Sequence, residues 1–95
     1  MAAKDRMAVL SAMMDQSIIP VFYHPDVELC KNVIQACANA GAKCVEFTNR
    51  GDFAAHVFYE VTRHFAKADP SVIMGVGLIV DAPTAALFIA NGAKF

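Results

Sequence analysis

Short apolar runs alternate along the chain with longer stretches in which apolar residues recur every three or four positions. Apolar runs bounded by turn residues predict strands over 18–23, 43–47 and 71–76. Helical spacing of apolar residues predicts helices over 3–16, between Asp26 and Gly41, between Asp52 and Asp69, and between Asp81 and Gly92. The chain therefore begins with a helix and continues as three strand-helix units.

The residues at the ends of these segments are those that helix boundaries favour. Asp26 and Asp81 each precede a helical stripe and are predicted to open the helix, because a carboxylate there accepts hydrogen bonds from free backbone N–H groups. Gly41 and Gly92 follow the last apolar positions of two helices, where glycine most easily takes the left-handed conformation. Residues 93–95 then begin a fourth strand.

Strands this apolar, each followed by a helix, predict a parallel sheet with helices on one face. In an open doubly wound fold helices also cover the second face, whereas in a barrel inward side chains fill the interior. Glu46, polar in the middle of the second strand, favours the barrel. The predicted fold class is α/β, a partial (β/α)8 or TIM-type barrel of about three strand-helix units and the start of a fourth strand. Residues 18–95 form this single domain, and residues 1–17 form an N-terminal helix that acts as a plug or lid.

The composition indicates that the chain has more apolar surface than it can bury within itself. Of its 95 residues 57% are hydrophobic, against about 45 to 50% in ordinary globular domains, and a chain this short hides surface inefficiently. We therefore expect self-association. The formal net charge of −1 and scattered basic residues predict no nucleic-acid partner. No apolar run approaches a membrane span and no signal peptide is recognisable, so we expect a cytoplasmic protein with no membrane partner.

The cysteines and histidines have no spacing typical of a metal site. Cys30, Cys37 and Cys44 lie seven residues apart without the close pairs of zinc motifs, so we expect buried free thiols. His56 and His64 fall on a helix that also carries Glu60 and Arg63, which is typical of a solvated face. No metal and no cofactor is predicted.

Candidate chemistry lies where the strands end, because parallel α/β folds form their sites at the carboxyl edge of the sheet. Alternation along the second strand places Cys44, Glu46 and Thr48 on one face. An inward carboxylate is costly unless it is paired or does acid-base work. Glu46 therefore has two interpretations, a catalytic acid-base group or an ion pair with Arg50 that fixes the loop. The turn at 49–52 ends in Asp52, which is predicted to cap the next helix.

The third strand ends in Gly75-Val76-Gly77, followed by Leu78. Glycines there allow the backbone to approach a ligand, for example a phosphate at the following helix, or allow tight packing at the strand end. A lone Gly-x-Gly motif does not distinguish a ligand site from tight packing.

Taken together, Val45 to Arg50, the Gly-x-Gly strand end and the ending Asn91 to Phe95 resemble the N-terminal part of 2-keto-3-deoxy-6-phosphogluconate aldolases, also described as 4-hydroxy-2-oxoglutarate aldolases. The similarity extends over nearly the whole chain from Ile18. The resemblance implies a trimeric (β/α)8 barrel that cleaves a 2-keto acid aldol to pyruvate and an aldehyde through a lysine Schiff base.

The resemblance also implies roles for individual residues. Glu46 matches the general acid-base glutamate, and Arg50 matches the arginine that holds the carboxylate of the keto-acid substrate. The remaining substrate-binding positions are Thr48, Gly75, Gly77 and Leu78. Leu78 departs from the family, which has Thr or Ser there to bind the keto acid through a hydroxyl.

The Schiff-base lysine of the family sits at the end of a later strand, beyond residue 95. Lys43 and Lys94 begin strands, Lys31 and Lys67 fall on helices, and Lys4 is near the terminus, so none is expected beside Glu46. The chain alone is therefore expected to be inactive, since losing the amine removes the covalent route. Two hypotheses remain open: the front part of a keto-acid aldolase, or a truncated or engineered partial-barrel scaffold that self-assembles and catalyses nothing.

Overall fold

A three-stranded parallel sheet in the order β1-β2-β3 forms the centre of the chain, of which the computed structural model describes residues 5–95. The strands are β1 (Val21–Phe22), β2 (Cys44–Thr48) and β3 (Ile73–Gly77). The helices are α1 (Arg6–Gln16), α2 (Val27–Asn39), α3 (Ala54–Ala68) and α4 (Ala82–Ala90). A helix connects each strand to its parallel neighbour, as such a connection requires. The predicted α/β order of strands and helices is confirmed.

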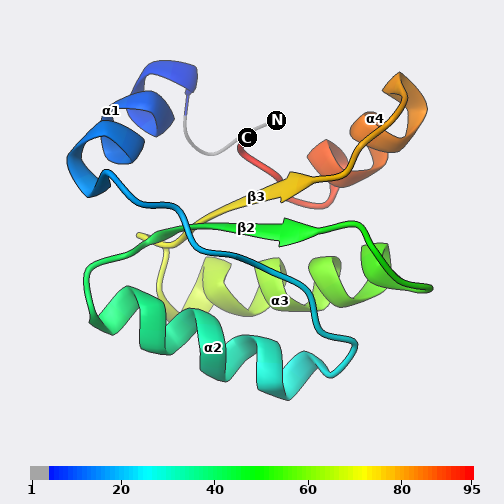
Figure 1. Cartoon of the computed structure of the whole chain (residues 1–95), viewed down its shortest axis with the longest axis horizontal. Helices are drawn as coiled ribbons and strands as arrows, with labels where there is room; N and C mark the ends of the chain where they lie inside the picture. The colour runs from blue at the N-terminus through cyan, green and yellow to red at the C-terminus, as the bar shows by residue number, and fades with distance from the viewer. Residues whose placement is uncertain (1–4) are drawn as a thin grey trace.

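Helices α2 and α3 lie side by side on one face of the sheet (Figure 1). This α2/α3 face receives Val45 and Phe47 of β2 and Met74 of β3, which are buried in the main apolar core. Helix α4 joins the same core through Phe88, whose ring packs edge-on against Phe58 of α3 with centroids 5.2 Å apart. The apolar stripes predicted for the helices that follow the strands therefore form the principal core with β2 and β3.

Helix α1 lies on the opposite face of the sheet (Figure 1), which we call the α1 face. Its buried Val9 packs against Cys44 and Ile73, the first residues of β2 and β3. The α1 helix thus covers the amino-terminal ends of the strands and leaves their carboxyl ends accessible to other groups. Residues 3 and 4 of the expected helix lie outside the described residues.

Gln16, the last residue of α1, joins that helix to the central strand. Its side-chain Nε2 donates to the carbonyl oxygen of Cys44 at 2.9 Å, and its Oε1 accepts from the Cys44 N–H at 2.8 Å. Strand β1 pairs with β2 only from Val21 opposite Glu46 onward. The Gln16 amide therefore satisfies the backbone groups of Cys44 in place of a neighbouring strand.

Most helix boundaries lie where the sequence predicts them. Asp26 Oδ1 accepts from two N–H groups of the first turn of α2, and Asp81 Oδ1 accepts from Thr84 N at the start of α4. Gly41 and Gly92 follow the ends of α2 and α4 with φ values of +100° and +111°. Both helices therefore end where the glycine permits a left-handed residue.

Three local predictions were wrong. The first strand is confined to Val21–Phe22, because Pro20 has no N–H to donate and only its carbonyl oxygen pairs, with Glu46 N at 2.9 Å. Asp52 does not cap α3; Phe53 takes that position with φ +63° and makes no side-chain cap hydrogen bond. Cys37 is only partly buried, although Cys30 and Cys44 are buried free thiols as expected.

The last residues of the chain run beside β3 and are joined to it by two backbone hydrogen bonds. Lys94 N donates to Met74 O at 2.8 Å, and Val76 N donates to Phe95 O at 3.0 Å. In a regular parallel ladder one residue would make both bonds, and residues 93–95 are not a strand of the sheet, which has three strands. The expected fourth strand is therefore not formed, although two backbone bonds hold the last residues beside β3.

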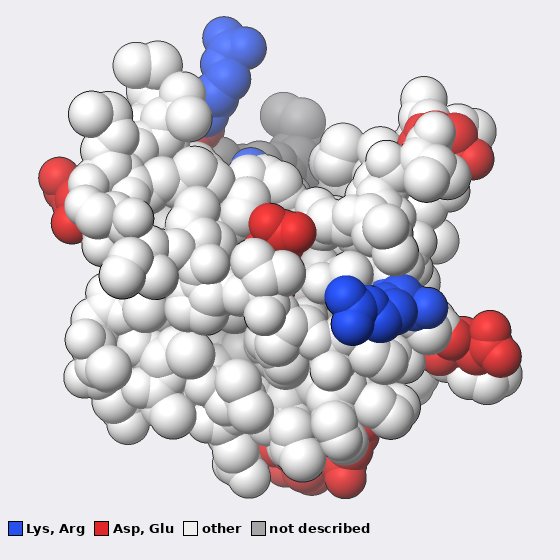
Figure 2. Space-filling model, viewed as in Figure 1, with Lys and Arg blue, Asp and Glu red and all other residues white. Residues whose placement is uncertain are grey.

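The surface carries few and separated charges. On the face seen in Figure 2, Lys and Arg do not gather into a stripe and most of the surface is uncharged. Large apolar side chains are exposed on several elements, among them Met14, Val21, Phe53 and Val80. Within residues 5–95, the helices are all too short or too polar to cross a lipid bilayer.

We predict that Gln16→Ala lowers the free energy of unfolding by about 1 to 2 kcal/mol, because the N–H and C=O of buried Cys44 lose their partners. Urea denaturation measures the change. Gln35→Ala is the matched control, since the Gln35 amide bonds only to exposed Asn39 on α2 and its loss should cost less than about 0.5 kcal/mol. Equal effects of the two substitutions would contradict this role for Gln16.

Candidate functional site

The two strand-end motifs singled out in the sequence lie next to each other in the sheet. In the β2–β3 register Glu46 is opposite Gly75 and Thr48 is opposite Gly77. The loop that follows is held to the same edge, because Asn49 N donates to the Gly77 carbonyl oxygen at 3.0 Å. The Glu-x-Thr and Gly-x-Gly segments therefore form one continuous surface at the carboxyl edge of β2 and β3.

Both glycines of this surface are opposite large side chains. A Cβ on Gly75 would collide with the Phe95 ring, and a Cβ on Gly77 would collide with the Glu46 carboxylate. Because the position opposite Glu46 is filled by Phe95, the Glu46 side chain extends along the strand toward Gly77. The glycines thus serve close packing within the chain, and the space at Gly77 positions the Glu46 carboxylate toward the carboxyl edge.

The side chains on either side of Glu46 differ in exposure. Cys44 and Thr48, on the same α1 face, are buried, whereas Glu46 itself is half-buried and reachable from solvent. Burial raises the pKa of the Cys44 thiol, so this sulfur stays protonated at neutral pH. Glu46 is therefore the ionisable carboxyl group on the middle of this face.

Arg50 follows β2 in the loop and is exposed. The alternative interpretation of the sequence, an ion pair between Glu46 and Arg50, is not found: within residues 5–95 the ion pair that forms is Lys31 with Glu28 on α2. The Arg50 guanidinium is thus free of a protein carboxylate while it lies at the same edge of the sheet as Glu46. Such a guanidinium can bind a carboxylate in two-point fashion.

Tyr23 adds a hydroxyl to this edge from the end of β1. Its ring is tilted on Phe47 with centroids 5.5 Å apart, and its hydroxyl lies where a Cβ on Gly51 would project. Only glycine at 51 leaves room for the tyrosine. The sequence placed Tyr23 at a strand end, but its contact with the loop after β2 depends on tertiary packing that no local pattern encodes.

Leu78 immediately follows β3 and has an unusual backbone. Its φ is +62°, in the left-handed region that a bulky side chain disfavours, and its side chain is 60% exposed. It therefore gains little burial in return for this conformation. Leu78 thus presents an apolar side chain to solvent beside Gly77.

The lysines of the described chain lie away from this edge. Lys43 precedes β2, and its Nζ donates to Ser71 Oγ at 2.8 Å. Lys94 lies beside Met74 of β3, and its side chain lines a groove on the α2/α3 side of the sheet. Lys31 and Lys67 are on α2 and α3, on the face of the sheet opposite to Glu46. The structure therefore brings none of these four amines to the Glu46 side chain, and Lys4 lies outside the described residues.

The histidines do not converge with other ligands. His24 Nδ1 accepts from Asp26 N at 3.0 Å, His56 is exposed on α3, and the His64 ring packs edge-on against Phe65. Within residues 5–95 no group of three or more His, Cys, Asp and Glu side chains has the arrangement of a metal site. The Glu46 edge remains the place where polar chemistry gathers.

Neither a protein-family model nor a curated protein matches the chain. The resemblance to keto-acid aldolases therefore stays a prediction from the motif residues.

We predict that Leu78→Gly raises the free energy of unfolding by about 0.5 to 1 kcal/mol. Glycine removes a left-handed strain of about 1 to 2 kcal/mol and costs about 0.5 to 1 kcal/mol in backbone entropy, while the exposed leucine loses little packing. Denaturant unfolding measures the change.

Val80→Gly is the matched control, because Val80 is 87% exposed in the same loop and is not among the residues with positive φ. Its replacement should lower stability by about 0.5 to 1 kcal/mol through entropy alone. A destabilising Leu78→Gly would show that the leucine makes contacts that outweigh its strain.

Proposed function

We propose that the chain carries the acid-base and carboxylate-binding part of a keto-acid aldolase site, built on part of a (β/α)8 barrel. The observation that carries the proposal is the alignment of β2 with β3, which sets the Glu46 carboxylate against Gly77 at the carboxyl edge. In this assignment Glu46 transfers protons and Arg50 binds the carboxylate of a pyruvate-like ligand. Thr48, Gly75 and Gly77 shape the surface between them.

The barrel assignment is supported by the two faces of the sheet. Helices cover the α2/α3 face, whereas on the other face α1 covers only the amino-terminal ends. Glu46 of β2 and Phe95 of the segment after α4 occupy part of the rest of that face. An interior filled by strand side chains is the arrangement of a barrel, whereas an open doubly wound sheet would have helices there.

Carbon-carbon cleavage in this proposal needs an amine that residues 5–95 do not bring to the site. Glu46 alone can move protons but cannot form the imine that makes cleavage feasible. The proposed activity of the chain by itself is therefore binding of a short 2-keto acid without turnover. Leu78, where a hydroxyl would help to hold the ligand, makes that binding weaker than in a complete site.

We predict that pyruvate shifts the backbone amide signals of Thr48, Asn49 and Gly77 in two-dimensional NMR, with a dissociation constant in the millimolar range. Arg50→Gln should weaken binding by about tenfold or more, because a hydrogen bond to a charged group contributes about 1.5 to 3 kcal/mol. Arg6→Gln is the matched control, since Arg6 is exposed on α1. Equal binding by the two variants, or shifts confined to other elements, would contradict the assignment.

Borohydride trapping with pyruvate separates binding from imine chemistry in the same samples. Mass spectrometry should find the unmodified mass, because no described lysine lies beside Glu46. A 1-carboxyethyl adduct, the reduced form of the pyruvate imine, on any lysine would overturn the proposal that the chain binds pyruvate without forming an imine.

A second candidate function is a self-assembling scaffold without catalysis, and the exposed apolar side chains favour it. On the edge strand Val21 is 58% exposed, and Ile18 just before it is exposed as well. An unpaired strand edge bearing apolar side chains is a template for pairing with another chain. In this candidate two copies associate through the β1 edge.

We predict that the chain self-associates at micromolar concentration and that Val21→Lys shifts the molecular mass, measured by light scattering after size exclusion, toward the monomer. A charge on an edge strand opposes strand pairing. Asn32→Lys, an equal change in charge at an exposed position on α2, should leave the mass unchanged. A wild-type monomer, or identical masses for the two variants, would exclude association through β1.

A further inference from the structure

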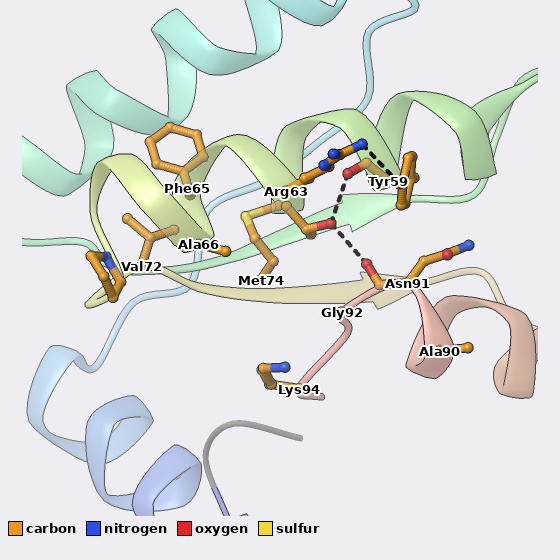
Figure 3. Close-up of a pocket in the computed structure, with 12 residues that line it drawn as sticks. Tyr59, Arg63, Phe65, Ala66, Val72, Met74, Ala90, Asn91, Gly92 and Lys94 are labelled. Atoms are coloured by element: carbon orange, nitrogen blue, oxygen red, sulfur yellow. Dashed lines mark hydrogen bonds between the residues drawn. The ribbon is translucent and has the colours of Figure 1, made fainter. Parts of the chain in front are cut away.

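A groove of about 520 Å³ lies on the α2/α3 side of the sheet, away from the Glu46 edge. One wall is α3, the floor is the start of β3, and the other wall is the segment from the end of α4 to Lys94 (Figure 3). No pattern in the sequence predicted it, because its walls come from three separated segments. Its volume falls in the range of about 300 to 1,000 Å³ typical of small-molecule sites.

The floor and the α3 wall of this groove are apolar. Phe65 and Ala66 contribute from α3, and Val72 and Met74 contribute from β3 and the residue before it. Phe65 and Met74 belong to the buried core and form the bottom of the groove, whereas Ala66 and Val72 are more accessible (Figure 3). Such a floor favours the apolar part of a ligand, since each buried methylene contributes to affinity.

The rim of the groove is basic. Arg63 from α3 and Lys94 from the opposite wall both line it. Arg63 Nη1 donates to the Tyr59 hydroxyl at 3.1 Å and lies near the Tyr59 ring, which holds the guanidinium along the α3 wall (Figure 3). Neither cation forms an ion pair with any carboxylate in residues 5–95.

No acidic residue lines the groove to oppose these cations. The acidic residues closest along the chain are Glu60 and Asp69, and neither is among the lining residues. Asp69 accepts from the Ser71 hydroxyl and N–H, and these bonds lower the pKa of Asp69 and keep it engaged beside β3. The electrostatic character of the groove is therefore set by Arg63 and Lys94.

The walls are joined to each other without a ligand. The Thr62 hydroxyl lies 2.8 Å from the Asn91 carbonyl oxygen and ties α3 to the end of α4. Gly92 lies against Thr62 with φ +111°, so the close approach depends on glycine. The groove is therefore preformed, which lowers the cost of binding.

From this combination we propose that the groove binds a small amphipathic carboxylate, with its apolar chain on the apolar floor and its carboxylate at the basic rim that carries Arg63 and Lys94. Charge complementarity selects this ligand class: a neutral amphiphile would leave the two cations unpaired, and a cationic one would be repelled. The site is independent of the Glu46 edge and of the function proposed for it.

Octanoate is a suitable probe, with octanamide as the neutral molecule of equal length. Octanoate should shift the amide signals of Ala66, Met74 and Gly92 and bind about three- to tenfold more tightly than octanamide, since two partly exposed ion pairs contribute modestly. The Arg63→Gln, Lys94→Gln double variant should lose this preference while it still binds octanamide. Lys67→Gln on α3, which does not line the groove, should keep it.

Ala66→Phe offers a second test that does not depend on charge, because the added ring would occupy the groove from the α3 wall. It should abolish octanoate shifts at Met74 while circular dichroism remains that of the wild type. Equal affinity for octanoate and octanamide in the wild type, or octanoate shifts that survive in Ala66→Phe, would overturn the proposal. Groove signals that change on dilution without any ligand would also overturn it, because a second copy of the chain would then be the occupant.

Discussion

The two faces of the central strand β2 are buried against different partners, and the rest of the structure depends on this constraint. Val45 and Phe47 enter the core beneath α2 and α3, while Cys44 packs against Val9 of α1. A shift of register by one residue would exchange these sets and bury Glu46 among phenylalanines. The helices, the α1 contact and the position of Glu46 are therefore fixed together by the alternation of one five-residue strand.

The two glycines of β3 leave room for large side chains on the α1 face of the sheet. With Phe95 over Gly75 and Glu46 over Gly77, a ring and a carboxylate pack where side chains of β3 would otherwise stand. The same complementarity gives the proposed site its geometry, because Glu46 is carried toward the loop that bears Arg50. The outer groove has a separate origin, in the contact of Thr62 with Asn91 and Gly92 that links α3 to α4.

Local patterns were sufficient to predict the elements. Helical stripes ending at Gly41 and Gly92, and caps at Asp26 and Asp81, depend on interactions within a few residues, so the sequence displays them directly. Alternation likewise predicted the face on which Glu46 lies. The errors arose where local patterns were not enough. β1 is short because Pro20 has no N–H and the Gln16 amide takes the backbone groups of Cys44. α3 begins after a left-handed Phe53 and not at Asp52. The positions of Phe95, of Tyr23 beside Gly51 and of the groove required distant segments to meet, and no spacing along the chain records that.

The function proposed for the β2–β3 edge requires Glu46 to lie on the α1 face against Gly77, and proton NOE spectroscopy measures this placement. We expect strong cross-peaks from the Glu46 Hγ protons to the Gly77 Hα protons, and from the Phe95 ring to the Gly75 Hα protons. Cross-peaks from Glu46 Hγ to the rings of Phe58 or Phe88, in the core beneath the opposite face, would contradict this placement.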